Sequence, residues 1–196
     1  MRHKIVGRWF RGALTAWALA CATVSSSSRA ADEVRIETQR HGNSVYVSVR
    51  ATIVASPRLA WAALTDYDRL ADFVPGFDRS SVVGRDGATA FVRQQGKANF
   101  WPFSWPIDVV VASREMPPHR IDIRMVQGNL RRLEGAYRLE PIGSAIVLHW
   151  DGTIEPAESL PPWIGELVIR RSVEAQFLGM VEEIERRQGR VTSTQR

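Results

Sequence analysis

One stretch near the end of the chain decides the fold: LPPWIGELVIRRSVEAQFLGMVEEIERR, residues 160–187. Pro161 and Pro162 stand at its start, where a helix tolerates proline because the first N–H groups have no partner inside the helix. No proline follows them. Apolar residues then recur at steps of three and four, which places them on one helix face: Ile169, Val173, Phe177, Met180, Val181 and Ile184. The stretch predicts a helix of about seven turns with one face built for burial.

The first half of this helix carries a second apolar set that points elsewhere, comprising Ile164, Leu167 and Val168, with Leu178 further along. A helix that is apolar on two sides must be surrounded by other elements. The sequence upstream of it is typical of strands, which favours a sheet curled around the helix.

The strand pattern is clearest in residues 45–54, where Val45, Val47, Val49 and Ile53 alternate with polar residues. Such a period of two indicates a strand with one buried face. Short turns separate the strands, so sequence neighbours are expected to pair antiparallel. The other expected strands are 34–40, 80–85, 88–97, 107–115, 120–126, 131–140 and 145–155.

Two short helices are expected after the first strand pair. Ser56-Pro57 is typical of a helix start, with serine as the N-cap and proline in the first turn. That helix should run to about Asp66, and a second should cover 67–73. The predicted fold class is α+β: a curved antiparallel sheet of about six to seven strands wrapped around the long C-terminal helix.

The N-terminal 30 residues have the three parts of a secretory signal peptide. A basic start (MRHKIVGRWFRG) precedes an apolar run over 13–24 and a small-residue cleavage site at Ser28-Arg29-Ala30. The apolar run is shorter than the about 20 residues that span a bilayer. We expect a periplasmic or secreted protein, cleaved near Ala30; a lipid tether at Cys21 is the alternative.

The net positive charge of the chain comes entirely from this N-terminal segment. The sequence has 26 basic and 21 acidic residues, and five of the basic ones lie in 1–30, which holds no acidic residue. Residues 31–196 therefore carry 21 of each, so the pI near 10.1 does not indicate a nucleic-acid partner. No cysteine remains after Cys21, so the domain expected over 31–188 has neither a disulfide nor a thiolate nucleophile. A tail over 189–196, rich in Arg, Ser and Thr, is expected to be disordered.

Three stretches resemble the START-like (SRPBCC) superfamily, and within it the polyketide cyclase/dehydrase and coenzyme Q-binding protein group. They are ATIVASPRLAWAALTDYDRLADFVPGF (51–77), VQGNLRRLEGAYRLEP (126–141) and the helix at 160–187. The resemblance covers 34–188 and implies the helix-grip fold, with a cavity between sheet and helix that holds an apolar ligand. A fold of this kind hosts many functions, so it does not decide the activity.

Catalytic and metal motifs are absent from the sequence: it contains no G-x-S-x-G, H-E-x-x-H, C-x-x-C or phosphate-binding glycine loop. We therefore expect no catalytic residues, no metal and no cofactor. Arg93 and Tyr137 are predicted to face the cavity and orient a ligand head group. The full set of candidate ligand-binding residues is Trp61, Phe73, Phe77, Phe91, Arg93, Trp101, Phe103, Trp105, Met125, Tyr137, Trp150, Trp163 and Leu167.

The stretch Asn99–Pro106 holds four large aromatic residues and two prolines, which excludes a regular strand centre. It is interpreted either as an apolar plug on the core or as a loop, Phe100–Trp105, that gates the cavity and transiently contacts a membrane. On the helix, the first-half set with Trp163 is expected to line or close the cavity, and the Ile169–Ile184 stripe to form the core.

The leading functional hypothesis is an exported, non-catalytic protein that binds or transfers a hydrophobic small molecule such as a lipid, quinone or isoprenoid. A cyclase or dehydratase that folds a polyketide-like substrate in the same cavity is the first alternative. A protein-interaction module that docks through the aromatic loop is the second.

Overall fold

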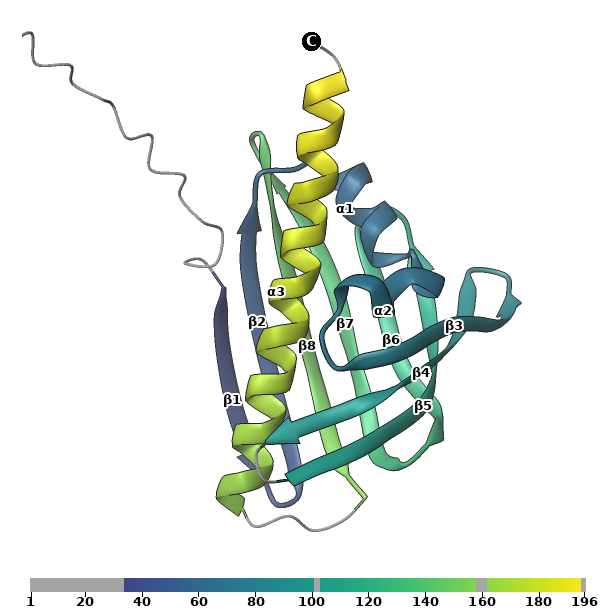
Figure 1. Cartoon of the computed structure of the whole chain (residues 1–196), viewed down its shortest axis with the longest axis vertical. Helices are drawn as coiled ribbons and strands as arrows, with labels where there is room; N and C mark the ends of the chain where they lie inside the picture. Colours follow the sequence, from purple (N-terminus) through teal and green to yellow (C-terminus); the bar gives the residue numbers. More distant parts are fainter. Residues whose placement is uncertain (1–33, 101–102, 158–161, 195–196) are drawn as a thin grey trace, which may run out of the picture.

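In the computed structural model, residues 34–100, 103–157 and 162–194 are described. A large sheet curls around one long helix, with two short helical elements beside it (Figure 1). The strands are β1 (Arg35–His41), β2 (Ser44–Ile53), β3 (Phe77–Asp86), β4 (Thr89–Phe100), β5 (Phe103–Met116), β6 (Arg120–Gly128), β7 (Leu130–Ile142) and β8 (Ala145–Pro156). The helices are α1 (Pro57–Leu64), the 3-10 turn η2 (Tyr67–Arg69), α2 (Leu70–Phe73) and α3 (Pro162–Thr194).

The eight strands form one sheet in the order β1-β2-β8-β7-β6-β5-β4-β3. Every neighbouring pair is antiparallel. The last strand closes beside the first pair, because β8 is hydrogen-bonded to β2 on one side and to β7 on the other. The predicted helix-grip fold is therefore confirmed, with eight strands in place of about six to seven.

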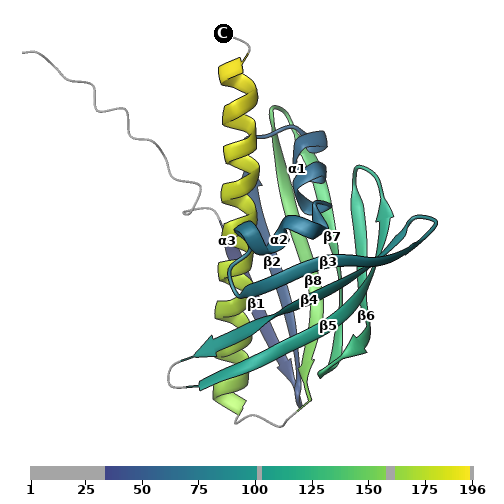
Figure 2. The same ribbon diagram turned by 45° about the vertical axis from the view of Figure 1, so that its right-hand side comes forward.

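The segment after β2 folds as its sequence indicates. The Ser56 side chain caps α1 by accepting a hydrogen bond from the Leu59 N–H at 3.3 Å, and Pro57 occupies the first turn. The η2 and α2 turns follow at once and lead into β3. We call residues 57–74 the helical cover; Figure 2 shows it lying beside α3, above β3 and β4.

Helix α3 buries the predicted stripe against the sheet: Ile169, Val173, Phe177, Met180, Val181 and Ile184 are all buried. The helix continues through Gln188 and Gly189 to Thr194. The expected disordered tail is therefore wrong over 189–194, where basic and polar residues form the exposed final turns of α3. No helix within the described ranges is long and apolar enough to cross a membrane.

The described part of the aromatic stretch belongs to the two strands of a hairpin. Strand β4 continues to Phe100, β5 starts at Phe103, and Lys97 pairs with Pro106. The pairing of β5 with β6 begins only at Val109, so Pro106, which precedes it, lies outside that pairing. This part of β5 has a strand on one side only, so it tolerates a residue that lacks an N–H.

Strand β4 turns the opposite face to the core from the one expected, since Phe91 and Arg93 were predicted to face the cavity. Ala90 and Val92 are buried in the core, while Arg93 is exposed on the other face. Gly96 lies on the same inward face, and the chain before β3 approaches it closely: a Cβ on Gly96 would lie 1.9 Å from the Gly76 carbonyl oxygen. The large Phe91 side chain lies outside, against Gly84 of β3.

Candidate functional site

A cavity of about 480 Å³ lies between the sheet and α3. Helix α3 contributes one wall through the face that carries the buried stripe, with Val168, Ile169, Ser172, Val173, Gln176, Phe177 and Met180. The middle of the helix therefore lines the cavity. Of the first-half set, Val168 lines it, whereas Ile164 and Leu167 do not.

The helical cover closes one end of the cavity with Leu64, Tyr67, Leu70 and Val74. The opposite wall is the concave face of the sheet. Its lining residues are mostly aliphatic or aromatic and come from six strands: Phe77, Gln94, Ala98, Trp105, Pro106, Ile107, Val109, Ser113, Ile121, Ile123, Leu130, Leu133, Tyr137, Trp150, Ile154 and Pro156.

Two paired glycines shape the floor of the cavity. Gly135 of β7 lies opposite Gly152 of β8. A Cβ on Gly152 would lie 2.6 Å from the Trp150 ring, and one on Gly135 would lie 3.1 Å from its Nε1. The indole therefore lies across a strip of sheet without side chains and presents its surface to the cavity.

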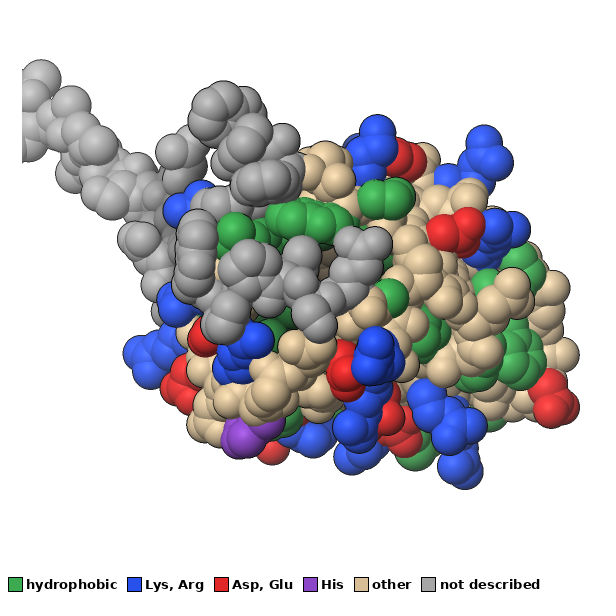
Figure 3. All heavy atoms as spheres, turned by 90° about the horizontal axis from the view of Figure 1, so that it is seen from below, with side chains coloured by type: hydrophobic (Ala, Val, Ile, Leu, Met, Phe, Trp, Pro, Cys, Tyr) green, Lys and Arg blue, Asp and Glu red, His purple; other side chains and the backbone are tan. Residues whose placement is uncertain are grey.

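The other end of the cavity is lined by Trp105, Asn129 and Ala157. They belong to β5, the β6–β7 turn and the segment after β8; these elements meet at the lower end of the molecule in Figure 1. Asn129 holds the β6–β7 turn to β5: its Nδ2 donates to the Pro106 carbonyl at 2.7 Å and its Oδ1 accepts from the Asp108 N–H at 2.9 Å. Figure 3, seen from this end, shows hydrophobic side chains gathered here with charged residues around them.

Tyr137 is the central polar group of the sheet wall. Its ring lies 6.3 Å from that of Trp150, between centroids, at a tilt of 42°. Burial raises the pKa of its hydroxyl, yet the side chain is only half-buried by surface area. The accessible part therefore faces the enclosed cavity and not bulk water.

Tyr67 stands at the closed end, near Ser113 and Glu115 of β5. Burial, followed by the negative charge of Glu115, raises the pKa of its hydroxyl. The hydroxyl oxygen is enclosed and makes no hydrogen bond of regular geometry with a described residue. Both cavity tyrosines are therefore neutral at physiological pH.

The candidate ligand-binding residues separate into three groups. Phe77, Trp105, Tyr137 and Trp150 line the cavity. Trp61, Phe73 and Met125 pack against the core outside the cavity lining, and Leu167 is half-buried on α3. Trp101 and the side chains of Phe103 and Trp163 lie outside the described parts of the structure.

Phe91 and Arg93 lie on the outer face of β4, which corrects the expectation that Arg93 faces the cavity. Arg93 donates to both carboxylate oxygens of Asp108, at 3.0 and 2.7 Å, and Gln95 donates to the same carboxylate at 3.1 Å. The hydrogen bond from Arg93 lowers the pKa of Asp108. Arg93 is thus an exposed ion-pair partner on the outer face of the sheet.

Sequence reasoning did not identify three polar cavity residues: Gln94, Ser172 and Gln176. A signal for two of them was present. Ser172 and Gln176 are four residues apart and lie beside Val173 and Phe177, so they share the buried face of α3. A polar pair within an apolar stripe indicates a lined cavity instead of a closed core.

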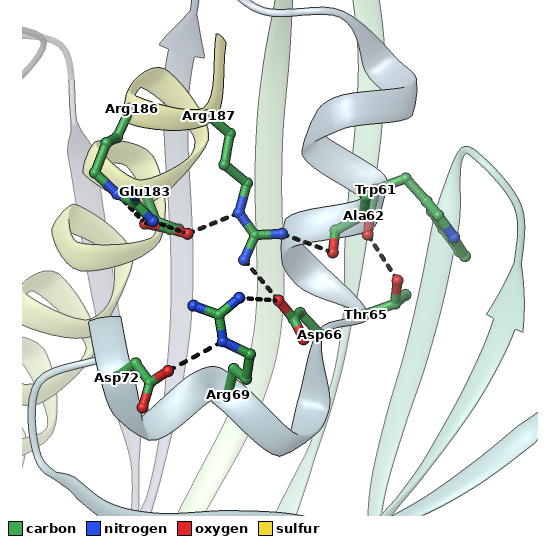
Figure 4. A network of polar contacts seen from close by, with 9 residues as sticks. All are labelled: Trp61, Ala62, Thr65, Asp66, Arg69, Asp72, Glu183, Arg186 and Arg187. Atoms are coloured by element: carbon green, nitrogen blue, oxygen red, sulfur yellow. Dashed lines mark hydrogen bonds and ion pairs between the residues drawn. The ribbon is translucent and has the colours of Figure 1, made fainter. Parts of the chain in front are cut away.

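Arg187 fastens the helical cover to α3 (Figure 4). Its guanidinium donates to Glu183 at 2.7 Å, to Asp66 at 2.7 Å and to the Ala62 carbonyl at 3.2 Å. It also lies 5.6 Å from the centroid of the Phe73 ring, a cation–π distance. Phe73 therefore contacts Arg187 of α3 from the cover, and the Trp61 indole points away from this network.

Metal chemistry has no candidate centre in the described ranges, where no group of three or more His, Cys, Asp or Glu side chains could hold an ion. All the lining side chains described above are uncharged. The arrangement can enclose an apolar molecule and hydrogen-bond to it.

Residues 44–188 match the family described as polyketide cyclase/dehydrase and lipid transport, so the chain belongs to that family. The match starts at β2 and ends in α3, so it spans every element that lines the cavity. No curated protein matches the chain.

Solved structures confirm the fold at low sequence identity. The STAR-related lipid transfer protein from Xanthomonas axonopodis superposes with a TM-score of 0.62 at 12% identity, covering 80% of this chain and 96% of that one. The Zhui aromatase/cyclase from Streptomyces sp. R1128 gives 0.60 at 16%, covering 75% and 94%. A START superfamily protein from Mycobacterium smegmatis gives 0.61 at 16%, covering 74% and 98%. The chain therefore has the START-like, hydrophobic ligand-binding fold.

Proposed function

We propose that this member of the family binds and transfers a hydrophobic small molecule (a lipid, quinone or isoprenoid) without transforming it. One observation carries the proposal: the cavity of about 480 Å³ with its largely apolar lining. Its volume falls in the range of about 300–1,000 Å³ typical of small-molecule sites. Apolar ligand surface moved from water into such a site stabilises the complex by about 25 cal/mol per Å².

Binding without turnover is favoured over a cyclase or dehydratase by the chemistry of the lining. Acid–base catalysis requires a group that titrates near the working pH and reaches the reacting atom. The titratable side chains of the described lining are Tyr67 and Tyr137, and burial raises the pKa of both hydroxyls. Neither supplies a base at neutral pH.

Export is part of the proposal and rests on the three-part leader over 1–30. The protein would work in the periplasm or outside the cell, either free after cleavage near Ala30 or tethered through Cys21. Radiolabelled palmitate supplied to the cells distinguishes these two forms. The tethered protein should incorporate the label, and the cleaved, free protein should not.

The proposal is tested by isolating the exported protein under native conditions, extracting it with organic solvent and analysing the extract by mass spectrometry. A stoichiometric lipid or quinone is the expected result. An empty cavity together with turnover of a polyketide-like substrate would replace it with the cyclase. An empty cavity together with a stable protein complex would replace it with the interaction module.

The β4–β5 hairpin is the proposed route of ligand exchange with a membrane. Support comes from the aromatic sequence Phe100–Trp105 and from the cavity, which reaches Trp105 and Pro106 near the tip of the hairpin. Aromatic side chains partition into the membrane interface. The Trp101→Ala, Trp105→Ala double variant should co-sediment less with neutral phosphatidylcholine liposomes; unchanged co-sedimentation contradicts this route.

A further inference from the structure

Besides Tyr67, Ser113 and Asn129, the cavity lining holds four neutral polar side chains on its two facing walls. They are Gln94 of β4, Tyr137 of β7, and Ser172 and Gln176 of α3. Each is half-buried. No hydrogen bond joins any of these side chains to another described residue. They form a set of polar groups on opposite walls of an otherwise apolar space.

Polar groups that are removed from water require hydrogen-bond partners, and unpaired ones are rare in folded proteins. Tyr137 is half-buried and lines the cavity, so the accessible part of its side chain faces the cavity. A ligand with its own hydroxyl or carbonyl groups would satisfy these side chains, whereas a pure hydrocarbon would leave them unpaired.

Three acidic residues close to the cavity are paired with arginines. Glu115, behind Tyr67, pairs with Arg85 at 3.3 Å. Asp66 and Glu183, at the helical cover, pair with Arg187. The described lining itself is uncharged. A carboxylate or phosphate drawn into this space would lose its hydration without meeting a cation, which is strongly unfavourable.

We propose that the cavity selects an uncharged lipid whose hydroxyl or carbonyl groups hydrogen-bond to Tyr137, Gln94 and Gln176, and that it rejects fatty-acid anions and phosphate head groups. This inference rests on the proposed function, because it names the class of ligand that the same cavity takes. Specificity then comes from matched neutral hydrogen bonds: a ligand without them leaves the polar side chains unpaired.

A matched pair of fluorescent probes tests the selection. cis-Parinaryl alcohol and cis-parinarate share one hydrocarbon chain and differ in the charge of the head group. Titrated into the delipidated exported protein at pH 8, the alcohol should bind at least ten-fold more tightly. Equal or tighter binding of parinarate overturns the inference and leaves the proposed function intact. Failure of both probes to bind overturns both.

Variants identify the hydrogen bonds. Tyr137→Phe should weaken binding of the alcohol about three- to ten-fold, the range for one neutral hydrogen bond. Tyr46→Phe is the matched control, because the Tyr46 hydroxyl bonds to Asp151 on the outer face of the sheet. Gln176→Leu probes the opposite wall independently of how well Tyr137→Phe folds. If both cavity variants bind the alcohol as the control does, the assignment of the polar groups is overturned.

Discussion

Glu183 is a buried carboxylate between two arginines. Its side chain is 4% exposed, and it accepts hydrogen bonds from Arg186 at 2.6 Å and from Arg187 at 2.7 Å. Burial alone would raise the pKa of Glu183, but the hydrogen bonds and charges of the two arginines outweigh it and lower the pKa. The ionised form is therefore favoured in the folded protein.

This lowered pKa predicts a pH-dependent contribution to stability. A carboxylate with a lower pKa in the folded state than in the unfolded state, about 4.3, stabilises the protein fully above the unfolded value. The contribution is lost as pH falls through the folded value. Glu183→Gln should therefore lower the free energy of unfolding by about 2 kcal/mol at pH 7, and the difference from wild type should shrink below pH 4.

Urea denaturation at pH 7, 5 and 3 measures the effect. Glu182→Gln is the control, because it removes a neighbouring carboxylate that is exposed on α3. The charge of Glu182 raises the pKa of Glu185. The control should change stability little at any of these pH values. A Glu183→Gln deficit that stays constant from pH 7 to pH 3 would show that the carboxylate charge does not stabilise the fold.

At the scale of elements, α3 approaches the helical cover at Gly179. A Cβ at this position would lie 2.2 Å from the Phe73 carbonyl oxygen and 2.5 Å from Cδ of Pro75. Backbone cannot move aside as a flexible side chain can, so Gly179→Ala should destabilise the protein by about 1–3 kcal/mol. The same substitution at Gly189 meets nothing within 4 Å.

Gly189→Ala should be neutral or stabilise α3 by up to about 1 kcal/mol, because alanine has the higher helix propensity. Comparing the urea midpoints of the two variants separates close packing from propensity in one helix. Equal midpoints would mean that the cover withdraws from α3 at no cost.

The sequence predicts the elements better than their faces. The stripe of α3 and the Ser56-Pro57 helix start could be predicted because local periodicity and capping determine them. The inward face of β4 could not, since Ala90, Val92 and Gly96 alternate with the larger Phe91, Arg93 and Gln95, and the size of the side chains favours the wrong face. The continuation of β4 to Phe100 and of β5 back to Phe103 was missed, because Pro106 is tolerated only where β6 does not pair with β5.

At the scale of the molecule, the cavity follows from the sheet and α3 enclosing more space than their side chains fill. Phe77, Trp105, Tyr137 and Trp150 could be named beforehand as large inward residues. Gln94 could not, because polar residues are usually assigned to the solvent face, and for Gln176 the one available signal was its place with Ser172 beside the apolar stripe of α3. Whether such residues bind ligand or pair with each other depends on the volume left between the layers.

The side chains that line an unfilled apolar cavity lack dispersion contacts on one side. A large side chain placed in the cavity should therefore block ligand binding without destabilising the protein. Ile123 faces the cavity from β6, so Ile123→Trp should place its indole in the space of about 480 Å³ without overpacking the core. We expect binding of cis-parinaryl alcohol to fall at least ten-fold, with the melting temperature changed by less than about 4 °C.

Val126→Trp is the control, because Val126 lies on the opposite face of the same strand and is 49% exposed; it should leave binding unchanged. Saturating alcohol at 100 times its Kd should stabilise wild type by about 2.7 kcal/mol and leave Ile123→Trp unaffected. Retained binding in Ile123→Trp would place the ligand site outside this cavity.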